Sequence, residues 1–469
     1  MTFATNARNV LMNSTDHRPL LKKKRFWIGL SGLLLISAVV GFSLLEYYRT
    51  EAMLTALRDA GLPTTSAEQD QYYVIPEGYP DTTDQWVRAL VALEAANRTA
   101  VPNNLPIVGT EDSEIPPPGE PWDKLQEAKV WLSQRSNELQ LVAAAAMAGG
   151  RVRFPIDLTM GINTLLPQAQ QTRDAARLLR LNAAVNAHEG EFAAAQTDLV
   201  FTLQLAEAMW AEPVLITQLI RMAIHGIACD GINDLLWHTE WNDQQLAELQ
   251  LRLREVDFRQ ALIRAMHGER AMFFSALDTV TLGPFRNSNI RQGIVLFDTV
   301  IDGLEKDWAA GIAAGAQATE DLRGLSANTK LQQMRSLGVL LLMPATEQAI
   351  SAGARSEAQQ RCTILALAIR RHWLKTGKVV DDLSQLPDEL IGENADRIRR
   401  DPFNGQPLLF QRNEHQFTIY SAGENQVDDG GKVEADGGAL EDIGFTIITQ
   451  PANDGAAEPT GTADQPSTD

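Results

Sequence analysis

The side chains that commonly carry out acid–base or metal chemistry are few and scattered in this chain of 469 residues. No histidine falls in an HExxH zinc motif, and the seven histidines are His17, His188, His225, His238, His267, His372 and His415. The sequence also lacks a GxSxG nucleophile motif and a phosphate-binding GxxxxGK[ST] loop. We therefore assign no catalytic residue and no organic cofactor from local motifs.

Two neighbouring pairs of reactive residues have simpler structural interpretations. His188 precedes Glu189 at the end of a helical pattern, where a histidine is commonly found. Cys229 precedes Asp230 within a helix, and adjacent helical side chains point apart. Neither pair has the spacing of a nucleophile with its base, so both are interpreted as structural.

Cys229 and Cys362 are the only cysteines, and each lies in an apolar helical pattern. In an exported protein the two could form a disulfide. They could also be two buried thiols that behave as small apolar side chains. The sequence leaves both interpretations open, but without a CxxC motif or a Cys/His cluster it indicates no zinc site.

The longest apolar stretch, residues 26–45, carries no charge and matches the roughly 30 Å hydrocarbon core of a bilayer. Aromatic residues stand at both ends, and four basic residues, 22–25, come directly before it. Basic flanks stay in the cytoplasm. The pattern predicts a single-pass helix in the inner (cytoplasmic) membrane, a cytoplasmic tail over residues 1–25, and the bulk of the chain outside the cytoplasm.

The same stretch has two features in common with processed export signals. It is longer than the apolar region of a cleaved signal peptide, and residues 41–43 form a poor cleavage site. Residues 41–46, Gly-Phe-Ser-Leu-Leu-Glu, resemble the processing site of type IV prepilins and pseudopilins. In that family the membrane stretch follows the site, whereas here it precedes it, so we interpret the match as coincidental.

Composition limits the partners of the chain. With 44% hydrophobic and 22% charged residues the chain is ordinary globular material. Its net charge of −19 argues against nucleic-acid binding, because neutralising phosphates needs a basic surface. We expect the lipid bilayer, contacted through residues 26–45, and other proteins as partners.

The middle of the chain predicts helices. Residues 46–121 should hold juxtamembrane helices and a Pro-rich loop, and residues 122–345 an α-helical domain in which short turns join the helices. Such a pattern favours an antiparallel bundle or a solenoid. Residues 188–195 resemble the helix–turn–helix junction of a tetratricopeptide repeat, although only one unit shows the pattern.

The end of the chain changes character. Two alternating segments, 408–412 and 416–421, predict a β-hairpin. Residues 401–408, 420–425, 428–431 and 441–443 resemble, in this order, motifs of the soluble head of type II secretion major pseudopilins. The resemblance covers about a fifth of the chain and implies a small α+β module over residues 346–448.

The module departs from that family in two places. The family's aromatic-Pro after the long helix is replaced by Lys-Val-Val at 378–380, and its amino-terminal helix with the cleavage site is absent. We therefore do not expect a pilus subunit. Residues 449–469, rich in Pro, Ala, Gly, Thr and Asp, predict a disordered acidic tail.

The acidic loop of pseudopilins binds calcium, and the resemblance implies a calcium site here. Its ligands by position are Ser421, Asn425, Asp428 and Asp442, with Asn425 standing where the family has Asp. Calcium takes six to eight oxygen ligands, and the ion would pin a loop that has few apolar residues. The alternative is a solvated, Gly-rich acidic turn.

These observations predict a mainly α-helical, membrane-anchored interaction or scaffold protein of the bacterial envelope, linked to secretion or envelope assembly, rather than an enzyme. The alternative is a membrane-tethered enzyme, such as a hydrolase, whose site is assembled from residues distant in sequence. Convergent His, Asp or Glu side chains in one cleft would favour the enzyme.

Overall fold

The computed structural model describes residues 18–98, 102–109, 114–279, 282–327, 329, 333, 336–342, 346–433 and 442–449. This part of the chain is mainly helical, with a small antiparallel sheet near the C-terminal end, which confirms the coarse fold prediction. Residues 1–17 of the predicted tail and residues 450–469 of the predicted acidic tail lie outside the described residues.

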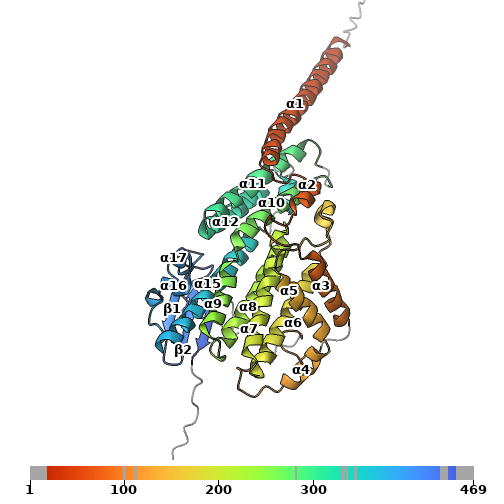
Figure 1. Ribbon diagram of the computed structural model, residues 1–469. Helices are drawn as coiled ribbons and strands as arrows, with labels where there is room; N and C mark the ends of the chain where they lie inside the picture. Colours follow the sequence, from red (N-terminus) through yellow and green to blue (C-terminus); the bar gives the residue numbers. More distant parts are fainter. Residues whose placement is uncertain are drawn as a thin grey trace, which may run out of the picture.

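The first helix, α1 (Arg18–Asp59), projects from one end of the body (Figure 1). It begins inside the segment predicted as a tail, continues past the apolar stretch 26–45 and ends at Asp59, just before Gly61, whose φ is 73°. Most large apolar side chains of that stretch are exposed, and α1 is long and apolar enough to cross a membrane. Helix α8 (Leu215–Leu235) has a similar length and composition but is mostly buried, as a core helix is.

The first half of the body follows α1 in an almost all-helical order. Its elements are α2 (Ser66–Tyr72), α3 (Thr83–Asn97), α4 (Leu125–Ser133), α5 (Ser136–Ala148), η1 (Leu158–Asn163), α6 (Gln168–His188), α7 (Phe192–Ala208), η2 (Met209–Ala211) and α8. Gly190, at φ 81°, makes the turn between α6 and α7, which pack against each other as the predicted helical hairpin.

The second half of the body ends in the sheet. Its helices are α9 (Asp243–Arg254), α10 (Phe258–Leu277), η3 (Gly283–Phe285), α11 (Arg286–Lys306), α12 (Trp308–Ala327), α14 (Leu337–Leu342), α15 (Thr346–Thr376), η4 (Leu383–Gln385), α16 (Asp388–Ile391) and α17 (Ala395–Ile398). Its strands are β1 (Leu409–Arg412), β2 (Gln416–Ser421) and β3 (Ile443–Ile448).

Local capping decides where several helices begin. Residues 241–243, Trp-Asn-Asp, predict an N-cap for a helix that runs to about residue 266. The cap is present, since Asn242 and Gln245 form a capping box with each other's backbone. The single helix expected from there to residue 266 was wrong, because Asp257 accepts a hydrogen bond from the Gln260 amide and starts α10 anew. The helical pattern over 122–148, followed by Gly149-Gly150, predicts one helix that the two glycines end. That prediction was wrong in one respect, because a tight turn at Arg135 divides the segment into α4 and α5.

Helix α15 is a central helix of the body. It lies between the other long helices and the sheet (Figure 1). Its 31 residues are apolar or buried on most sides, as expected of a helix surrounded by other elements. Ala354 and Ala358 belong to a buried cluster with α10, α11 and α12, whereas Leu365 and Ile369 belong to another with α7, α8, α9 and the sheet. Each cluster therefore combines residues from both sides of position 346, where the C-terminal module was predicted to begin.

The sheet has the order β1-β2-β3 and is antiparallel throughout. The hairpin predicted over 408–421 is present, with Phe410 paired to Ile419. Strand β3 was not predicted. It pairs with β2, and its Ile447 lies opposite Phe417 of β2. Both of these side chains are buried in the core cluster that includes α15, so the sheet is held by apolar packing against the helices.

Candidate functional site

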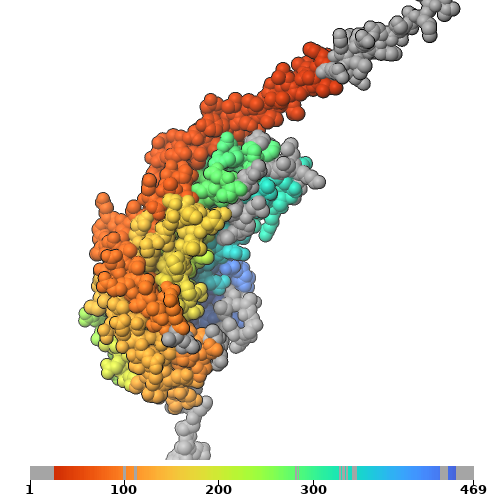
Figure 2. Space-filling model, turned by 90° about the vertical axis from the view of Figure 1, so that its right-hand side faces the viewer, coloured from red at the N-terminus to blue at the C-terminus, as the bar shows by residue number. Residues whose placement is uncertain are grey.

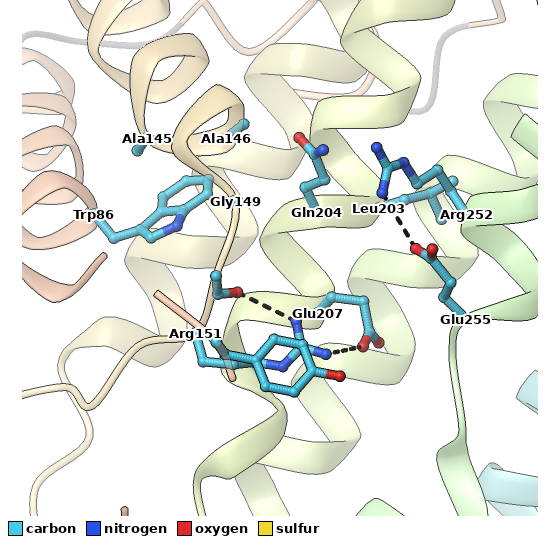
Figure 3. Close-up of a pocket in the computed structure, with 12 residues that line it drawn as sticks. Trp86, Ala145, Ala146, Gly149, Arg151, Leu203, Gln204, Glu207, Arg252 and Glu255 are labelled. Carbon is cyan, nitrogen blue, oxygen red and sulfur yellow. Dashed lines mark hydrogen bonds and ion pairs between the residues drawn. The ribbon is translucent and has the colours of Figure 1, made fainter. Parts of the chain in front are cut away.

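A cavity of about 320 Å³ opens between α3, α5, α7 and the end of α9 (Figure 3). Its wall combines one buried indole, Trp86, with the polar side chains of Arg151, Gln204, Glu207 and Arg252. Polar groups that converge in a cavity of this size are typical of small-molecule sites. This pocket, bounded by Trp86, Arg151, Gln204, Glu207 and Arg252, is called the polar pocket below.

Two glycines after α5 bring Arg151 to the pocket. Gly149 and Gly150 have φ values of 67° and 84°, which an L side chain rarely adopts. A Cβ on Gly150 would lie 2.2 Å from the carbonyl oxygen of Pro80. The Arg151 amide donates a hydrogen bond to that same oxygen over 3.0 Å, so the chain needs glycine to place Arg151 here.

Glu207 on α7 lies between two guanidinium groups. Arg151 donates to its Oε2 over 3.2 Å, and the fully buried Arg221 donates to its Oε1. The Arg151 guanidinium also lies 4.1 Å from the ring centre of Tyr79, a cation–π contact. Both oxygens of Glu207 therefore accept charge-assisted hydrogen bonds, which hold this carboxylate between the two arginines.

Three buried polar atoms of the pocket find no hydrogen-bond partner in the described part of the chain. They are the Nε atoms of Arg151 and Arg252 and the Oε1 atom of Gln204. Arg252 makes a single ion pair, from its Nη1 to Glu255 over 3.3 Å. Buried polar groups are nearly always paired, and each unpaired one costs about 1–3 kcal/mol. These atoms are enclosed by neighbouring groups, so they do not face the open space of the pocket.

A second buried carboxylate, Glu212, belongs to the framework of the body. It is fully buried and accepts hydrogen bonds from Thr217, Gln168 and Tyr73 over 2.5, 3.0 and 3.3 Å. Burial raises its pKa to about 7, and the three donors lower it in part. Since these side chains bind one another, Glu212 links α2, α6 and α8 rather than facing a cavity.

Two histidines that the sequence gave no reason to pair lie in one cleft of about 190 Å³, together with Asp234. His188 Nε2 lies 2.9 Å from the Pro116 carbonyl oxygen, and burial lowers the pKa of His238. Asp234 pairs with Arg180. In the described residues no hydrogen bond joins either imidazole to this carboxylate, so the cleft holds acid–base groups without an assembled pair.

The two cysteines are free, fully buried thiols. Cys229 Sγ lies 3.4 Å from His225 Nδ1, but burial raises the pKa of both thiols and lowers the pKa of His225 to about 3. A thiol is a nucleophile only as the thiolate. The structure therefore agrees with the buried-thiol interpretation and makes a Cys–His nucleophile at this position unfavourable.

The residues predicted to bind calcium lie at the end of β2 (Ser421), in the turn that follows it (Asn425 and Asp428) and directly before β3 (Asp442). Ser421 Oγ accepts from the Gly423 amide over 3.0 Å, and the exposed Asn425 donates to Asp429 over 2.7 Å. Asp428 Oδ1 accepts from the Gly430 amide over 2.9 Å. Asp442 Oδ2 accepts from the Gly431 amide over 2.8 Å, so Asp428 and Asp442 hold the same turn from opposite ends.

These contacts leave the calcium prediction open. Tyr420 donates to Asp428 over 3.0 Å, and burial together with this carboxylate raises the pKa of Tyr420 to about 12. Within the described residues, no group of three or more His, Cys, Asp or Glu side chains could hold a metal ion. The hydroxyl, amide and carboxylate oxygens of Ser421, Asn425, Asp428 and Asp442 remain the predicted ligand set, and all four accept hydrogen bonds from backbone amides.

The polar pocket was not predicted, because its residues come from four segments distant in sequence and form no local motif. The one usable signal was Gly149-Gly150, which was interpreted only as the end of a helix. In comparisons with known proteins, the chain matches no protein-family model, no curated protein and no solved structure. The pseudopilin-like and tetratricopeptide-like resemblances therefore stay predictions.

Proposed function

We propose that the protein is a membrane-tethered binding or scaffold protein of the bacterial envelope, with its helical body held outside the cytoplasm at a fixed orientation to the bilayer. The observation that carries this proposal is the joint between α1 and the body. Helix α1 continues without a break from the apolar stretch 26–45 onto the surface of α11. Figure 2 shows the base of α1 lying against the green atoms of that region.

Three different contacts make the joint. Arg291 on α11 donates two hydrogen bonds to Glu46, a buried carboxylate directly after the apolar stretch. Thr50 donates to the Asn287 carbonyl oxygen over 3.1 Å. One turn below, apolar residues of α1 pack on the core cluster of α10 and α11: Met53, Leu54 and Leu57. Contacts of this kind hold the body in a fixed position relative to α1. If α1 spans the bilayer, the body then keeps a fixed orientation to the membrane, as a scaffold requires.

The orientation rests on the basic residues 22–25, because positive flanks stay in the cytoplasm. The link to secretion or envelope assembly rests on the pseudopilin-like motifs at the end of the chain, and a resemblance of folds does not by itself assign a function. We infer the compartment from the basic residues 22–25 and the link to secretion or envelope assembly from the pseudopilin-like motifs.

Cysteine labelling tests this topology directly, since the two native thiols are buried and should not react. Ser133→Cys adds a thiol at an exposed position of the body, and Asn6→Cys adds one to the predicted tail. We expect a membrane-impermeant maleimide to label the first in intact spheroplasts and the second only after lysis. The reverse pattern, or recovery of the full-length protein in the soluble extract, would overturn the proposal.

A tethered hydrolase is the second candidate, and the cleft with His188, His238 and Asp234 favours it. Its test is a panel of chromogenic ester, amide, phosphate and glycoside substrates offered to the full-length protein in detergent micelles. Hydrolysis that is lost in His188→Ala and His238→Ala but kept in His415→Ala, which changes an exposed histidine, would establish the enzyme. No turnover of any substrate above that of the buffer would remove this candidate for these bond types.

A further inference from the structure

We propose that the end of the helical body next to α1 enters the surface of the lipid bilayer through an apolar patch of its own. The patch consists of Phe285 of η3 together with Leu337 and Leu340 of α14, and it is called the membrane patch below. The inference rests on the proposed function, because it needs α1 to cross the bilayer. It goes beyond that function by assigning the body a second contact with lipid.

The body reaches α1 inside the apolar stretch and not only at its end. The rings of Phe42 and Phe285 pack edge to face, with their centres 6.4 Å apart. Phe42 lies three residues before the end of the stretch 26–45, which places it about 4 Å inside the stretch at 1.5 Å per residue. Basic residues 22–25 on one side and Glu46 on the other limit how far this stretch can shift through a bilayer. Helix η3 therefore packs on α1 at a level that belongs to the hydrocarbon.

Helix α14 is apolar on all sides but is not enclosed by protein on all sides. Its sequence is Leu-Gly-Val-Leu-Leu-Leu, and Val339 is fully buried. The amides of Gly338 and Val339 donate to Asn289 Oδ1 at the start of α11 over 2.9 and 3.4 Å. Leu337, by contrast, is 39% exposed, and Leu340 is partly exposed. A helix that is apolar all round is normally buried. This side of α14 therefore lacks cover within the described residues.

The two elements of the membrane patch lie at the same end of the body. A Cβ built on Gly338 of α14 would lie 3.5 Å from Cδ1 of Leu282, the residue directly before η3. Helix η3 in turn contacts α1. Figure 2 shows α1 rising obliquely above the green atoms of η3 and α11. A bilayer crossed by α1 therefore lies next to this end of the body.

The charges at this end permit contact with an anionic bilayer. The segment 328–345 contains Lys330 and Arg335 but no Asp or Glu, although the whole chain carries a net charge of −19. Beside η3, Asp278 is paired with Arg286. Basic residues next to an apolar surface are attracted to anionic lipid headgroups. The repulsion expected between an acidic protein and such lipids is therefore weakest where the patch needs it to be weak.

The bilayer is the occupant that the neighbouring contacts favour. Tyr47 and Tyr48 directly follow the apolar stretch and are 50% and 69% exposed, as expected of aromatic side chains at the headgroup level. Lipid that surrounds α1 at this level reaches Phe285 and α14 without a further partner. Removing apolar surface from water stabilises the contact by about 25 cal/mol per Å².

The experiment measures contact with acyl chains on the full-length protein in phosphatidylcholine vesicles. Leu337→Cys is labelled with bimane, since the two native thiols are buried. The quencher is a phosphatidylcholine that carries a nitroxide on its acyl chain close to the headgroup. We expect bimane at Leu337 to lose about half of its emission, because interfacial apolar groups enter the acyl-chain boundary by about 5–10 Å.

Two control positions make the result specific. Val40→Cys is the positive control, because Val40 is exposed within the apolar stretch, and it should be quenched at least as strongly. Leu251→Cys is the matched negative control, because Leu251 is an exposed leucine of α9, well away from α1 in Figure 1. Bimane at Leu251 should lose less than about a tenth of its emission, since a position in water does not touch acyl chains.

Leu340→Cys provides a second position three residues further along α14, and the urea midpoint of each variant shows whether it folds as the wild type does. Quenching at Val40 without quenching at Leu337 and Leu340 would overturn the inference and leave the tethering by α1 intact. A protein that covers the patch would give this same result. Absence of quenching at Val40 as well would overturn both proposals, and equal quenching at Leu337 and Leu251 would overturn the membrane patch.

Discussion

Arg291 on α11 donates hydrogen bonds to both carboxylate oxygens of Glu46 on α1, over 3.1 and 3.2 Å. Glu46 is only 3% exposed, although it is the residue that ends the apolar stretch of the sequence. A buried carboxylate needs a partner of opposite charge, so α11 determines the point at which α1 leaves the body. The same pair fixes the body relative to the predicted membrane helix.

Arg291→Met should therefore lower the free energy of unfolding by about 2 kcal/mol, since it leaves Glu46 buried and unpaired. We expect Glu46→Gln combined with Arg291→Met to recover part of this loss. Urea unfolding of the full-length protein in detergent micelles measures it. Glu51→Gln is the control on the same helix, because it breaks the exposed Glu51–Arg58 pair and should cost less than about 1 kcal/mol. Equal effects of the two changes would contradict the role of the joint.

The parts of the fold that local signals define were predictable. Gly190 separates α6 from α7, Asn242 caps α9, and the alternating segments around Asn413 form a hairpin, all as the sequence indicated. These features depend on backbone conformations and hydrogen bonds between residues a few positions apart. Tertiary contacts were not needed to recognise them.

The features that the sequence did not indicate depend on contacts between distant segments. Strand β3 forms because it pairs with β2 and because its Ile447 packs with Phe417 in the core cluster that includes α15. The polar pocket depends on Arg151 meeting Glu207, 56 residues further along the chain. Periodicity shows that a residue is polar or apolar, but it does not show which distant residue it will meet.

Gly150 should be intolerant of any side chain. Its φ of 84° strains an L residue, and a Cβ would also collide with the Pro80 carbonyl oxygen. Gly78 is the matched control, because its φ is 88° and nothing lies within 4 Å of a Cβ built on it. We expect Gly78→Ala to cost about 1 kcal/mol. Gly150→Ala should cost about 1–3 kcal/mol more, measured by urea unfolding. Equal losses of unfolding free energy would show that backbone strain alone, and not the collision with Pro80, sets the cost at Gly150.

Both cysteines should be present as thiols in the purified protein. Burial raises the pKa of each thiol, so we expect no reaction of the native protein with Ellman's reagent. In denaturant without reductant, the two free cysteines should give two thiols per chain. A value of zero would mean that Cys229 and Cys362 form a disulfide in the natural protein.

Calcium at the turn after β2 can be tested on the full-length protein. If the resemblance to pseudopilins extends to the metal, calcium raises the unfolding midpoint and a chelator lowers it. Asp428→Asn should abolish this difference, because it removes one charge of the predicted ligand set. Asp396→Asn changes an exposed aspartate on α17 and should preserve the difference. An identical midpoint with calcium and with chelator would leave the solvated acidic turn as the correct interpretation.

Glu212 should make the stability of the body fall as the pH rises. Burial raises its pKa from 4.5 to about 7, so the folded state binds the proton more tightly than the unfolded state does. The stabilising effect of the proton is complete below about pH 4.5 and is lost as the pH rises to about 7. Over this window Glu212 should contribute a decrease of about 3 kcal/mol in the free energy of unfolding.

Glu212→Gln isolates this contribution, since the amide is neutral at every pH. The buried Oε1 atom of Gln168, which has no partner in the described residues, can accept the new N–H group after its amide rotates. We expect the variant to lose the part of the pH slope that Glu212 causes, whereas Glu320→Gln, at an exposed glutamate, should follow the wild type. Some slope should persist in Glu212→Gln, because burial also raises the pKa of Asp198 to about 7. Parallel curves for the wild type and Glu212→Gln, measured by urea unfolding from pH 4 to 8, would mean that Glu212 is ionised in the folded protein throughout and that its three donors outweigh its burial.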